Sequence, residues 1–263
     1  MKAQSITNFI KLKKNNQKFA TVTCYDSSFS QIIEQAEIPL ILIGDSLGMV
    51  VQGKSNTLSV TVDDISYHTK CVAATNHKSL LMADMPFMSY QNPKDACFNA
   101  AKLIQSGAHM VKLEGGIWLK DTISMLTERA IPVCAHIGLT PQSVNIFGGF
   151  KIQGKTNEDA DRIINEALRL QNAGAQLLVI ECVPENLATE VTKLLDIPVI
   201  GIGAGKNTDG QILVLHDILG ISSGYIPKFA QNFLEKENSI LDALKSYKKS
   251  VELGLFPSKE HIF

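Results

Sequence analysis

The sequence contains few of the features that mark membrane, secreted or nucleic-acid-binding proteins. No apolar stretch approaches the roughly 20 residues that a membrane-spanning helix needs, and the amino terminus lacks the apolar core of a signal peptide. The formal net charge is −1, and the basic residues form no dense cluster beyond Lys11, Lys13, Lys14 and Lys18. A nucleic-acid-binding surface would need a much denser positive field. These absences predict no membrane or nucleic-acid partner and favour small molecules.

Cysteine usage also excludes two classes of protein. The five cysteines are odd in number, scattered and never spaced as CxxC: Cys24, Cys71, Cys97, Cys134 and Cys182. This pattern argues against a disulfide framework and against a zinc site, and it predicts a cytoplasmic location. Residues 1–18 are basic and free of acids, which weakly resembles an organelle transit sequence, but the stretch 5–14 reads better as a short helix.

Short apolar runs bounded by turn signals recur along the whole chain. Such runs are typical of strands buried on both faces, and they cover residues 19–26, 39–46, 79–85, 109–115, 132–138, 176–183, 198–205 and 211–218. Helix-like segments lie between them. Eight strands alternating with helices favour an α/β fold of the (β/α)8 barrel (TIM barrel) type over an open doubly wound sheet, which would more often have five to seven strands and a phosphate-binding fingerprint after the first.

The whole chain, 1–263, is therefore predicted to form a single barrel domain with a short N-terminal helix and a C-terminal helical tail. The tail covers residues 238–254, and its apolar face should pack on the barrel wall or on another subunit. Two longer loops, 47–60 and 139–156, follow the second and fifth strands. Long loops in such positions are commonly lids or binding loops.

Several of the apolar runs end in charged or hydrogen-bonding residues. Because barrel active sites lie at the carboxyl ends of the strands, these side chains should meet in one pocket. Asp45, Asp84 and Glu114 would bring three carboxylates together, and such carboxylates repel one another unless they are protonated or share a cation. Oxygen ligands without His or Cys favour Mg²⁺ over zinc. The alternative is that each acid caps a helix or pairs with a lysine.

Three further strand-end residues could act on a substrate. Lys112 lies two residues before Glu114, so both side chains point to the same barrel face, where Lys112 could bind an anionic substrate, act as a Schiff-base lysine or form a structural ion pair with Glu114. Anion binding is favoured, since nearby acids keep a lysine charged. Glu181 suits a general base that removes a carbon-bound proton. His136 could donate a hydrogen bond to a substrate oxygen, serve as a secondary acid, or be structural.

The sequence blocks themselves resemble those of the ketopantoate hydroxymethyltransferase (3-methyl-2-oxobutanoate hydroxymethyltransferase) family. The blocks are GDSLGMVVQG, TLSVTVDDISYHT, ADMPFMSY, KLEGG, PVCAHIGLTPQSVN with FGGFKIQGK, ECVP, IPVIGIGAG and DGQILVLHD. The likeness runs from about Ile6 to Phe229, and the blocks occur in the family order.

This resemblance implies a barrel of the phosphoenolpyruvate/pyruvate type, Mg²⁺ as the metal, and a homodecamer. By the same resemblance Asp45, Asp84 and Glu114 would hold the metal, and Ser46, Asp84 and Lys112 would contact the 2-oxo acid. Asp45 and His136 are counted with the predicted substrate-binding residues because of their places at the strand ends. Glu181 would be the catalytic proton acceptor. Each of these positions holds a residue of the expected type.

The implied reaction is the first step of pantothenate biosynthesis. It transfers a hydroxymethyl group from the co-substrate 5,10-methylenetetrahydrofolate to 3-methyl-2-oxobutanoate and gives 2-dehydropantoate and tetrahydrofolate. Glu181 would take the C3 proton to form a metal-stabilised enolate, and Phe147 or Phe150 could stack on the folate. Two rival readings are a phosphoenolpyruvate mutase or isocitrate lyase type enzyme, for which no KKCGH-like loop follows residues 79–85, and a barrel that binds a ligand without catalysis.

Overall fold

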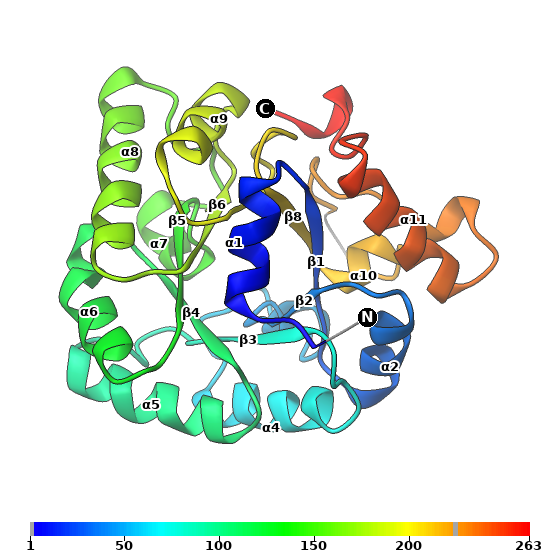
Figure 1. Cartoon of the computed structure of the whole chain (residues 1–263), viewed down its shortest axis with the longest axis horizontal. Coiled ribbons are helices and arrows are strands. Elements are labelled where there is room, and N and C mark those ends of the chain that lie inside the picture. The colour runs from blue at the N-terminus through cyan, green and yellow to red at the C-terminus, as the bar shows by residue number, and fades with distance from the viewer. Residues whose placement is uncertain (1–2, 223–225) are drawn as a thin grey trace.

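The computed structural model, which describes residues 3–222 and 226–263, contains a closed barrel of eight parallel strands in sequential order (Figure 1). The strands are β1 (Phe19–Thr23), β2 (Leu40–Ile43), β3 (Leu80–Asp84), β4 (Met110–Glu114), β5 (Val133–Gly138), β6 (Leu177–Glu181), β7 (Val199–Ile202) and β8 (Gly210–Leu213). Their residues are almost all buried, as expected for parallel strands covered on the outside by helices. The predicted (β/α)8 barrel is confirmed.

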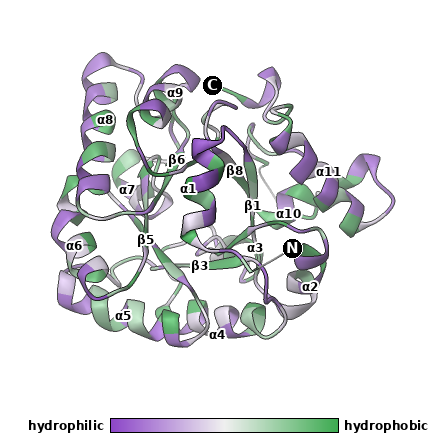
Figure 2. Ribbon diagram, in the orientation of Figure 1, coloured by the Kyte–Doolittle hydropathy of each residue, from purple (hydrophilic) through white to green (hydrophobic). Residues whose placement is uncertain are grey.

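The outer layer consists of amphipathic helices, most of which begin with a side-chain cap. The main helices are α2 (Ser27–Gln35), α4 (Val62–Ala73), α5 (Pro93–Gln105), α6 (Lys120–Glu128), α8 (Asn157–Asn172), α9 (Glu185–Leu194) and α11 (Ile240–Glu252). Thr61 and Asp64 form a capping box at the start of α4, and Pro93 opens α5 behind an Asn92 cap. Hydrophobic and hydrophilic residues alternate along these helices in Figure 2. Among the described residues, none of the helices has the length and apolarity to cross a membrane.

The two long loops contain short helices. The first begins with α3 (Leu47–Val50), and the second contains the 3₁₀ turn η2 (Pro141–Ser143) and α7 (Val144–Phe147). Three further 3₁₀ turns are η1 (Ile117–Leu119), η3 (Leu234–Lys236) and η4 (Lys259–His261).

The predicted strand at 211–218 is wrong in its second half. The strand β8 ends at Leu213, and Leu215–Ile218 form the short helix α10. Paired strands β1 and β8 run together only as far as Val22 and Leu213. Beyond that point the backbone N–H of Leu215 donates to the side-chain oxygen of Thr23 at 3.0 Å, so no backbone partner remains to extend the ladder.

The amino-terminal end of the barrel is closed by α1 (Ile6–Lys14), which lies across the barrel in Figure 1. This segment is helical, as predicted. The ring of Phe9 is fully buried and packs edge-on against Phe19, with ring centroids 4.9 Å apart. Phe9 belongs to the cluster that fills the barrel interior together with Phe19, Leu40, Leu80, Met82, Met110, Leu177 and Ile212. This half of the barrel is therefore a packed apolar core.

The C-terminal helix α11 packs on the barrel wall. Leu244, Tyr247 and Val251 are buried, and the hydroxyl of Tyr247 lies 2.9 Å from the carbonyl oxygen of Thr21 and 3.0 Å from that of Gln211. The tyrosine thus ties α11 to β1 and β8, the first and last strands of the barrel. The predicted apolar face finds its partner within the same chain.

Replacing Phe9 with alanine should lower the free energy of unfolding by about 3–5 kcal/mol, because it opens a cavity where α1 closes the barrel. Urea unfolding followed by circular dichroism measures the effect. Thr7→Ala, at an exposed position of the same helix, should change stability by less than about 0.5 kcal/mol. Equal effects of the two substitutions would show that α1 does not stabilise the barrel.

Candidate active site

The polar strand ends converge at the carboxyl-terminal end of the barrel, on β2 to β6. Asp84, Glu114 and Glu181 are the last residues of β3, β4 and β6. Asp45 and Ser46 directly follow β2. In the strand register Asp84 lies opposite Lys112, and Glu114 lies opposite His136. The structure therefore brings together the residues that the sequence singled out, in the following network of contacts.

Lys112 is at the centre of this network and is almost fully buried. Its ammonium nitrogen lies 2.8 Å from Oδ1 of Asp84, 3.4 Å from Oε1 of Glu114 and 3.2 Å from Nδ1 of His136. Burial alone would lower the pKa of Lys112, but the carboxylates of Asp84, Glu114 and Asp45 outweigh it and hold the pKa well above its usual range. Lys112 is therefore a fixed positive charge at neutral pH.

Asp45 and Asp84 form a pair of adjacent buried acids. The backbone N–H of Asp45 donates to Oδ2 of Asp84 at 2.9 Å. Burial raises the pKa of both carboxyl groups, and the negative charges of Asp84 and Glu114 raise that of Asp45 further. A side chain at Gly44 would begin 2.8 Å from Oγ of Ser46 and 3.5 Å from Oδ2 of Asp84, so glycine leaves room for both groups. The negative charges of Asp45 and Asp84 are thus not fully balanced by the neighbouring positive charge.

Glu114 and His136 are bound more tightly into the network. Oε1 of Glu114 lies 3.2 Å from Nδ1 of His136, and Oε2 accepts the backbone N–H of Gln142 at 3.0 Å. Burial would raise the pKa of Glu114, but Lys112 and His136 outweigh it and lower the pKa to about 2. Among the described residues, therefore, both oxygens of Glu114 already have partners.

His136 connects Glu114 to Glu181, whose Oε2 lies 3.2 Å from Nε2 of His136. Burial and the neighbouring Lys112 would lower the pKa of His136, but its contacts with Glu114 and Glu181 outweigh them and raise the pKa to about 9. The imidazole is therefore protonated at neutral pH. Glu181 is the more open end of this chain of contacts, with 12% of its side chain exposed.

Three residues of the site were missed at the sequence level: Tyr25, Tyr90 and Gln142. The hydroxyl of Tyr25 lies 2.8 Å from Oγ of Ser46. The side-chain amide of Gln142 donates to Oδ2 of Asp45 at 2.9 Å, and the hydroxyl of Tyr90 donates to Oε1 of Gln142. The ring of Tyr90 stacks on Trp118, with centroids 6.0 Å apart and an interplanar angle of 10°. The position of Gln142 in the long loop after β5 is the one signal that could have drawn attention to it.

Asp45 and Asp84 have the chemistry of a hard-metal site. Within residues 3–222 and 226–263, no group of three or more His, Cys, Asp or Glu side chains is already arranged around a metal position. The two acids nevertheless offer carboxylate oxygens in a buried place with excess negative charge, where Oδ1 of Asp84 has the Lys112 ammonium at 2.8 Å as its ion-pair partner. Mg²⁺ typically takes one or two protein carboxylates and completes its shell with water and substrate oxygens. The residues present fit that ion.

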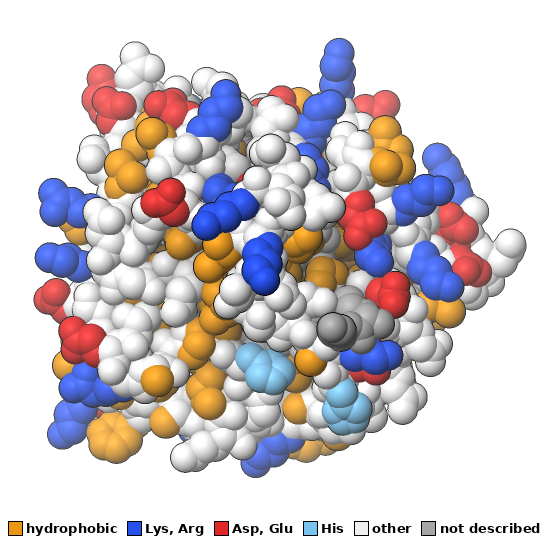
Figure 3. Space-filling model, in the orientation of Figure 1, with side chains coloured by type: hydrophobic (Ala, Val, Ile, Leu, Met, Phe, Trp, Pro, Cys, Tyr) orange, Lys and Arg blue, Asp and Glu red, His pale blue; other side chains and the backbone are white. Residues whose placement is uncertain are grey.

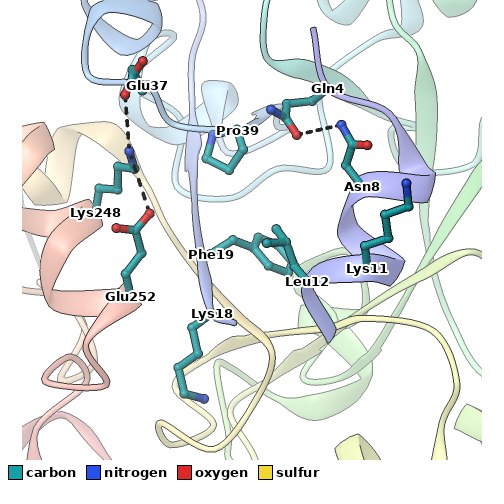
Figure 4. Close-up of a pocket in the computed structure, with 10 residues that line it drawn as sticks. All are labelled: Gln4, Asn8, Lys11, Leu12, Lys18, Phe19, Glu37, Pro39, Lys248 and Glu252. Carbon is teal, nitrogen blue, oxygen red and sulfur yellow. Dashed lines mark hydrogen bonds and ion pairs between the residues drawn. The ribbon is translucent and has the colours of Figure 1, made fainter. Parts of the chain in front are cut away.

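A surface cavity of about 360 Å³ lies at the opposite, amino-terminal end of the barrel (Figure 4). Ten residues of α1, β1, α11 and the connecting segments line it: Gln4, Asn8, Lys11, Leu12, Lys18, Phe19, Glu37, Pro39, Lys248 and Glu252. Basic and acidic side chains are interspersed over this face (Figure 3). The cavity contains none of the strand-end residues, so it is separate from the buried polar network.

The sequence model of the ketopantoate hydroxymethyltransferase family matches residues 3–259. The chain belongs to this family. Its similar relatives include 3-methyl-2-oxobutanoate hydroxymethyltransferase of Vibrio parahaemolyticus serotype O3:K6 (strain RIMD 2210633), 60% identical over 99% of both chains. The enzyme of that name from Vibrio vulnificus (strain YJ016) is 59% identical over the same shares. The expected family and the expectation of an enzyme are thus confirmed.

Solved structures with the same fold are far more distant in sequence. Phosphonopyruvate hydrolase in complex with oxalate and Mg²⁺ has a TM-score of 0.63 at 13% identity, covering 82% of this chain and 83% of that chain. 2,3-Dimethylmalate lyase, a member of the PEP mutase/isocitrate lyase superfamily, has a TM-score of 0.56 at 13% identity, covering 79% and 80%. These likenesses show that this chain shares their barrel fold.

Replacing Lys112 with methionine should lower the free energy of unfolding by about 3–5 kcal/mol, because it leaves Asp84 and Glu114 buried without their cation. In a Lys112→Met/Asp84→Asn double variant, part of that loss should be recovered, which urea unfolding of the four proteins of the cycle would show. The matched control is Lys102→Met, which removes an exposed partner of Asp63 and should cost less than about 1 kcal/mol. Strict additivity of the Lys112 and Asp84 effects would contradict the pairing.

Proposed function

We propose that this protein is a 3-methyl-2-oxobutanoate hydroxymethyltransferase that uses 5,10-methylenetetrahydrofolate as its one-carbon donor. The reaction adds a hydroxymethyl group to C3 of the keto acid, consumes water, and leaves 2-dehydropantoate and tetrahydrofolate. It would be the first step of pantothenate biosynthesis. The observation that carries the proposal is the joined network of Asp45, Asp84, Lys112, His136 and Glu181 in a chain 60% identical to a relative of that name.

The basic and hydroxyl groups of the site suit a 2-oxo acid. The substrate carries a carboxylate next to a keto group, and Lys112 supplies a permanent positive charge for them. Ser46 offers a hydroxyl whose position is fixed by Tyr25 at 2.8 Å. Together with Asp45 and Asp84, these residues would orient the keto acid at the carboxyl end of the barrel.

A divalent ion, Mg²⁺ in our proposal, would be held by Asp45 and Asp84. Glu114 would be the third carboxylate of this set. Its oxygens contact Lys112, His136 and Gln142, as those of Asp84 contact Lys112 and the backbone of Asp45. When bound, the ion would supply Lewis-acid polarisation of the keto acid and so make its C3 proton more acidic. The Mg²⁺ and oxalate in the phosphonopyruvate hydrolase complex support this assignment by analogy of fold.

Glu181 is proposed as the general base. Its carboxylate accepts the proton from C3 of the keto acid, and the protonated His136 at 3.2 Å fixes its orientation. C3 of the resulting enolate then attacks the one-carbon unit of the folate, and hydrolysis releases tetrahydrofolate. Phe147 and Phe150 stay candidates for stacking on the folate ring, and 51% of the Phe150 side chain is exposed for such a contact.

The charge state of Lys112 argues against a Schiff-base aldolase mechanism. That mechanism requires a neutral amine as nucleophile, whereas the surrounding carboxylates hold the pKa of Lys112 well above its usual range. Lys112 is therefore suited to anion binding. A structural ion pair is not an exclusive alternative, because the same charge that neutralises Asp84 also faces the substrate site.

We further propose that the enzyme acts in the cytoplasm as a homodecamer, as the family resemblance implies. All five cysteines are free, as is usual in a reducing compartment. Two large aromatic side chains on neighbouring outer helices, Tyr67 of α4 and Phe98 of α5, are 65% and 67% exposed.

Removal of divalent metal should abolish formation of 2-dehydropantoate, because the excess negative charge at Asp45 and Asp84 would then be compensated by protons in place of an ion. Treatment with EDTA followed by gel filtration should reduce turnover at least a hundredfold, and added Mg²⁺ should restore it. The assay follows tetrahydrofolate release and product formation together. Full activity of metal-free protein would exclude the proposed role of the ion.

Glu181→Gln should block exchange of the C3 proton of the keto acid with solvent deuterium, measured by proton NMR without folate. The amide cannot accept the proton, and the expected loss is about 10²–10⁴-fold. Binding of the keto acid, measured by calorimetry in the presence of Mg²⁺, should stay within a few fold. Unchanged exchange in the variant would remove Glu181 from the role of base.

A further inference from the structure

Both polar groups of the Gln142 side chain form hydrogen bonds that connect the loop after β5 to the candidate active site. Its Nε2 donates to Oδ2 of Asp45 at 2.9 Å and to the carbonyl oxygen of Met85 at 3.0 Å. Its Oε1 accepts from the buried hydroxyl of Tyr90, and its backbone N–H donates to Oε2 of Glu114 at 3.0 Å. One residue thus contacts the segments that follow β2 and β3 and the last residue of β4.

An amide is the side chain that these partners require. Asp45 and the carbonyl of Met85 are both acceptors, so they need the two donors of an NH₂ group, while Tyr90 supplies a donor and needs an acceptor. A carboxylate at position 142 would face two acceptors. An apolar side chain would leave Asp45 and the carbonyl of Met85 without their bonds to the amide, and the Tyr90 hydroxyl would keep only its contact with the backbone carbonyl of Glu114 at 3.1 Å. Gln142 is 6% exposed, so water cannot readily replace the lost contacts.

We propose that Gln142 is a positioning residue that couples the order of the loop 139–156 to the orientation of the Asp45 carboxylate. The hydrogen bond from Gln142 to Oδ2 restrains the orientation of the Asp45 carboxylate. The loop in turn depends on the same bonds, since Gln142 lies in η2 at its start. The inference rests on the proposed function for the assignment of Asp45 as a metal ligand.

Coupling has a direct consequence for the metal site. Partners that orient a metal-binding carboxylate typically change metal affinity by 10–100-fold when they are removed. Loss of the Gln142 side chain should therefore weaken ion binding and loosen the loop at the same time. Loss of a residue that only filled space would not change ion affinity and loop order together.

The test compares Gln142→Leu with Tyr90→Phe and with the control Gln153→Leu. Gln153 lies in the same loop, but its side-chain amide donates to the carbonyl of Lys151 and not to the site. Circular dichroism first establishes that each variant is folded. The first readout is the affinity for Mn²⁺ in the absence of keto acid and folate, measured by electron paramagnetic resonance of the free ion, so that it does not depend on activity.

The second readout is the rate of tryptic cleavage after Lys151 and Lys155, two exposed sites in the loop, in metal-free protein. Gln142→Leu should bind Mn²⁺ at least tenfold more weakly than the wild type and be cleaved several-fold faster. Tyr90→Phe should show both effects to a smaller degree, and it takes the place of Gln142→Leu if that variant does not fold. Gln153→Leu should match the wild type in both measurements.

The outcomes separate this inference from the proposed function. If the wild type binds Mn²⁺ and the folded Gln142 variant changes in neither readout, or in one of the two only, the coupling is refuted while the function stands. If the wild-type protein binds no Mn²⁺, the metal assignment fails and the coupling to it fails as well. A parallel change in Gln153→Leu would assign the effects to the loop as a whole and would also refute a specific role of Gln142.

Discussion

Compensation of buried charge is the constraint on which the candidate active site depends. Three acids, Asp45, Asp84 and Glu114, share a buried space with two bases, Lys112 and the protonated His136. Three negative charges against two positive ones leave an excess of one. Burial first, and then the charges of Asp84 and Glu114, raise the pKa of Asp45, so this carboxyl group favours its protonated form. A proton and a divalent ion would therefore compete for the same carboxylates.

The two ends of the barrel differ in the kind of side chain that they bury. At the amino-terminal end, Phe9 of α1 and Phe19 of β1 close an apolar core, which provides burial without any polar group to satisfy. At the carboxyl-terminal end, β3, β4 and β6 terminate in charged residues whose bonds come mainly from each other and from the following loops. This division, with stability at one end and chemistry at the other, is general among (β/α)8 barrels.

The residues of the candidate site that lie on strands could be predicted from the sequence. Asp84, Lys112, Glu114 and Glu181 could be located because each ends a short apolar run, or precedes its end by one alternation. Gln142 and Tyr90 could not be located in this way. Their contacts depend on the conformation of loops, and a loop conformation produces no regular spacing of residue types in the sequence. The role of His136 as a bridge required the cross-strand register with Glu114 and the approach of Glu181 from the next strand. The end of β8 depended on a side chain of another strand, Thr23.

The stacking of Trp118 on Tyr90 gives the protein an optical signal of its own. Trp118 is the single tryptophan of the chain, it is 59% exposed, and the ring beneath it is hydrogen-bonded to the residue that holds Asp45. Indole emission responds to small changes in the neighbouring ring and in hydration. Events at the buried carboxylates can therefore be followed by intrinsic fluorescence in real time, without a label and without turnover.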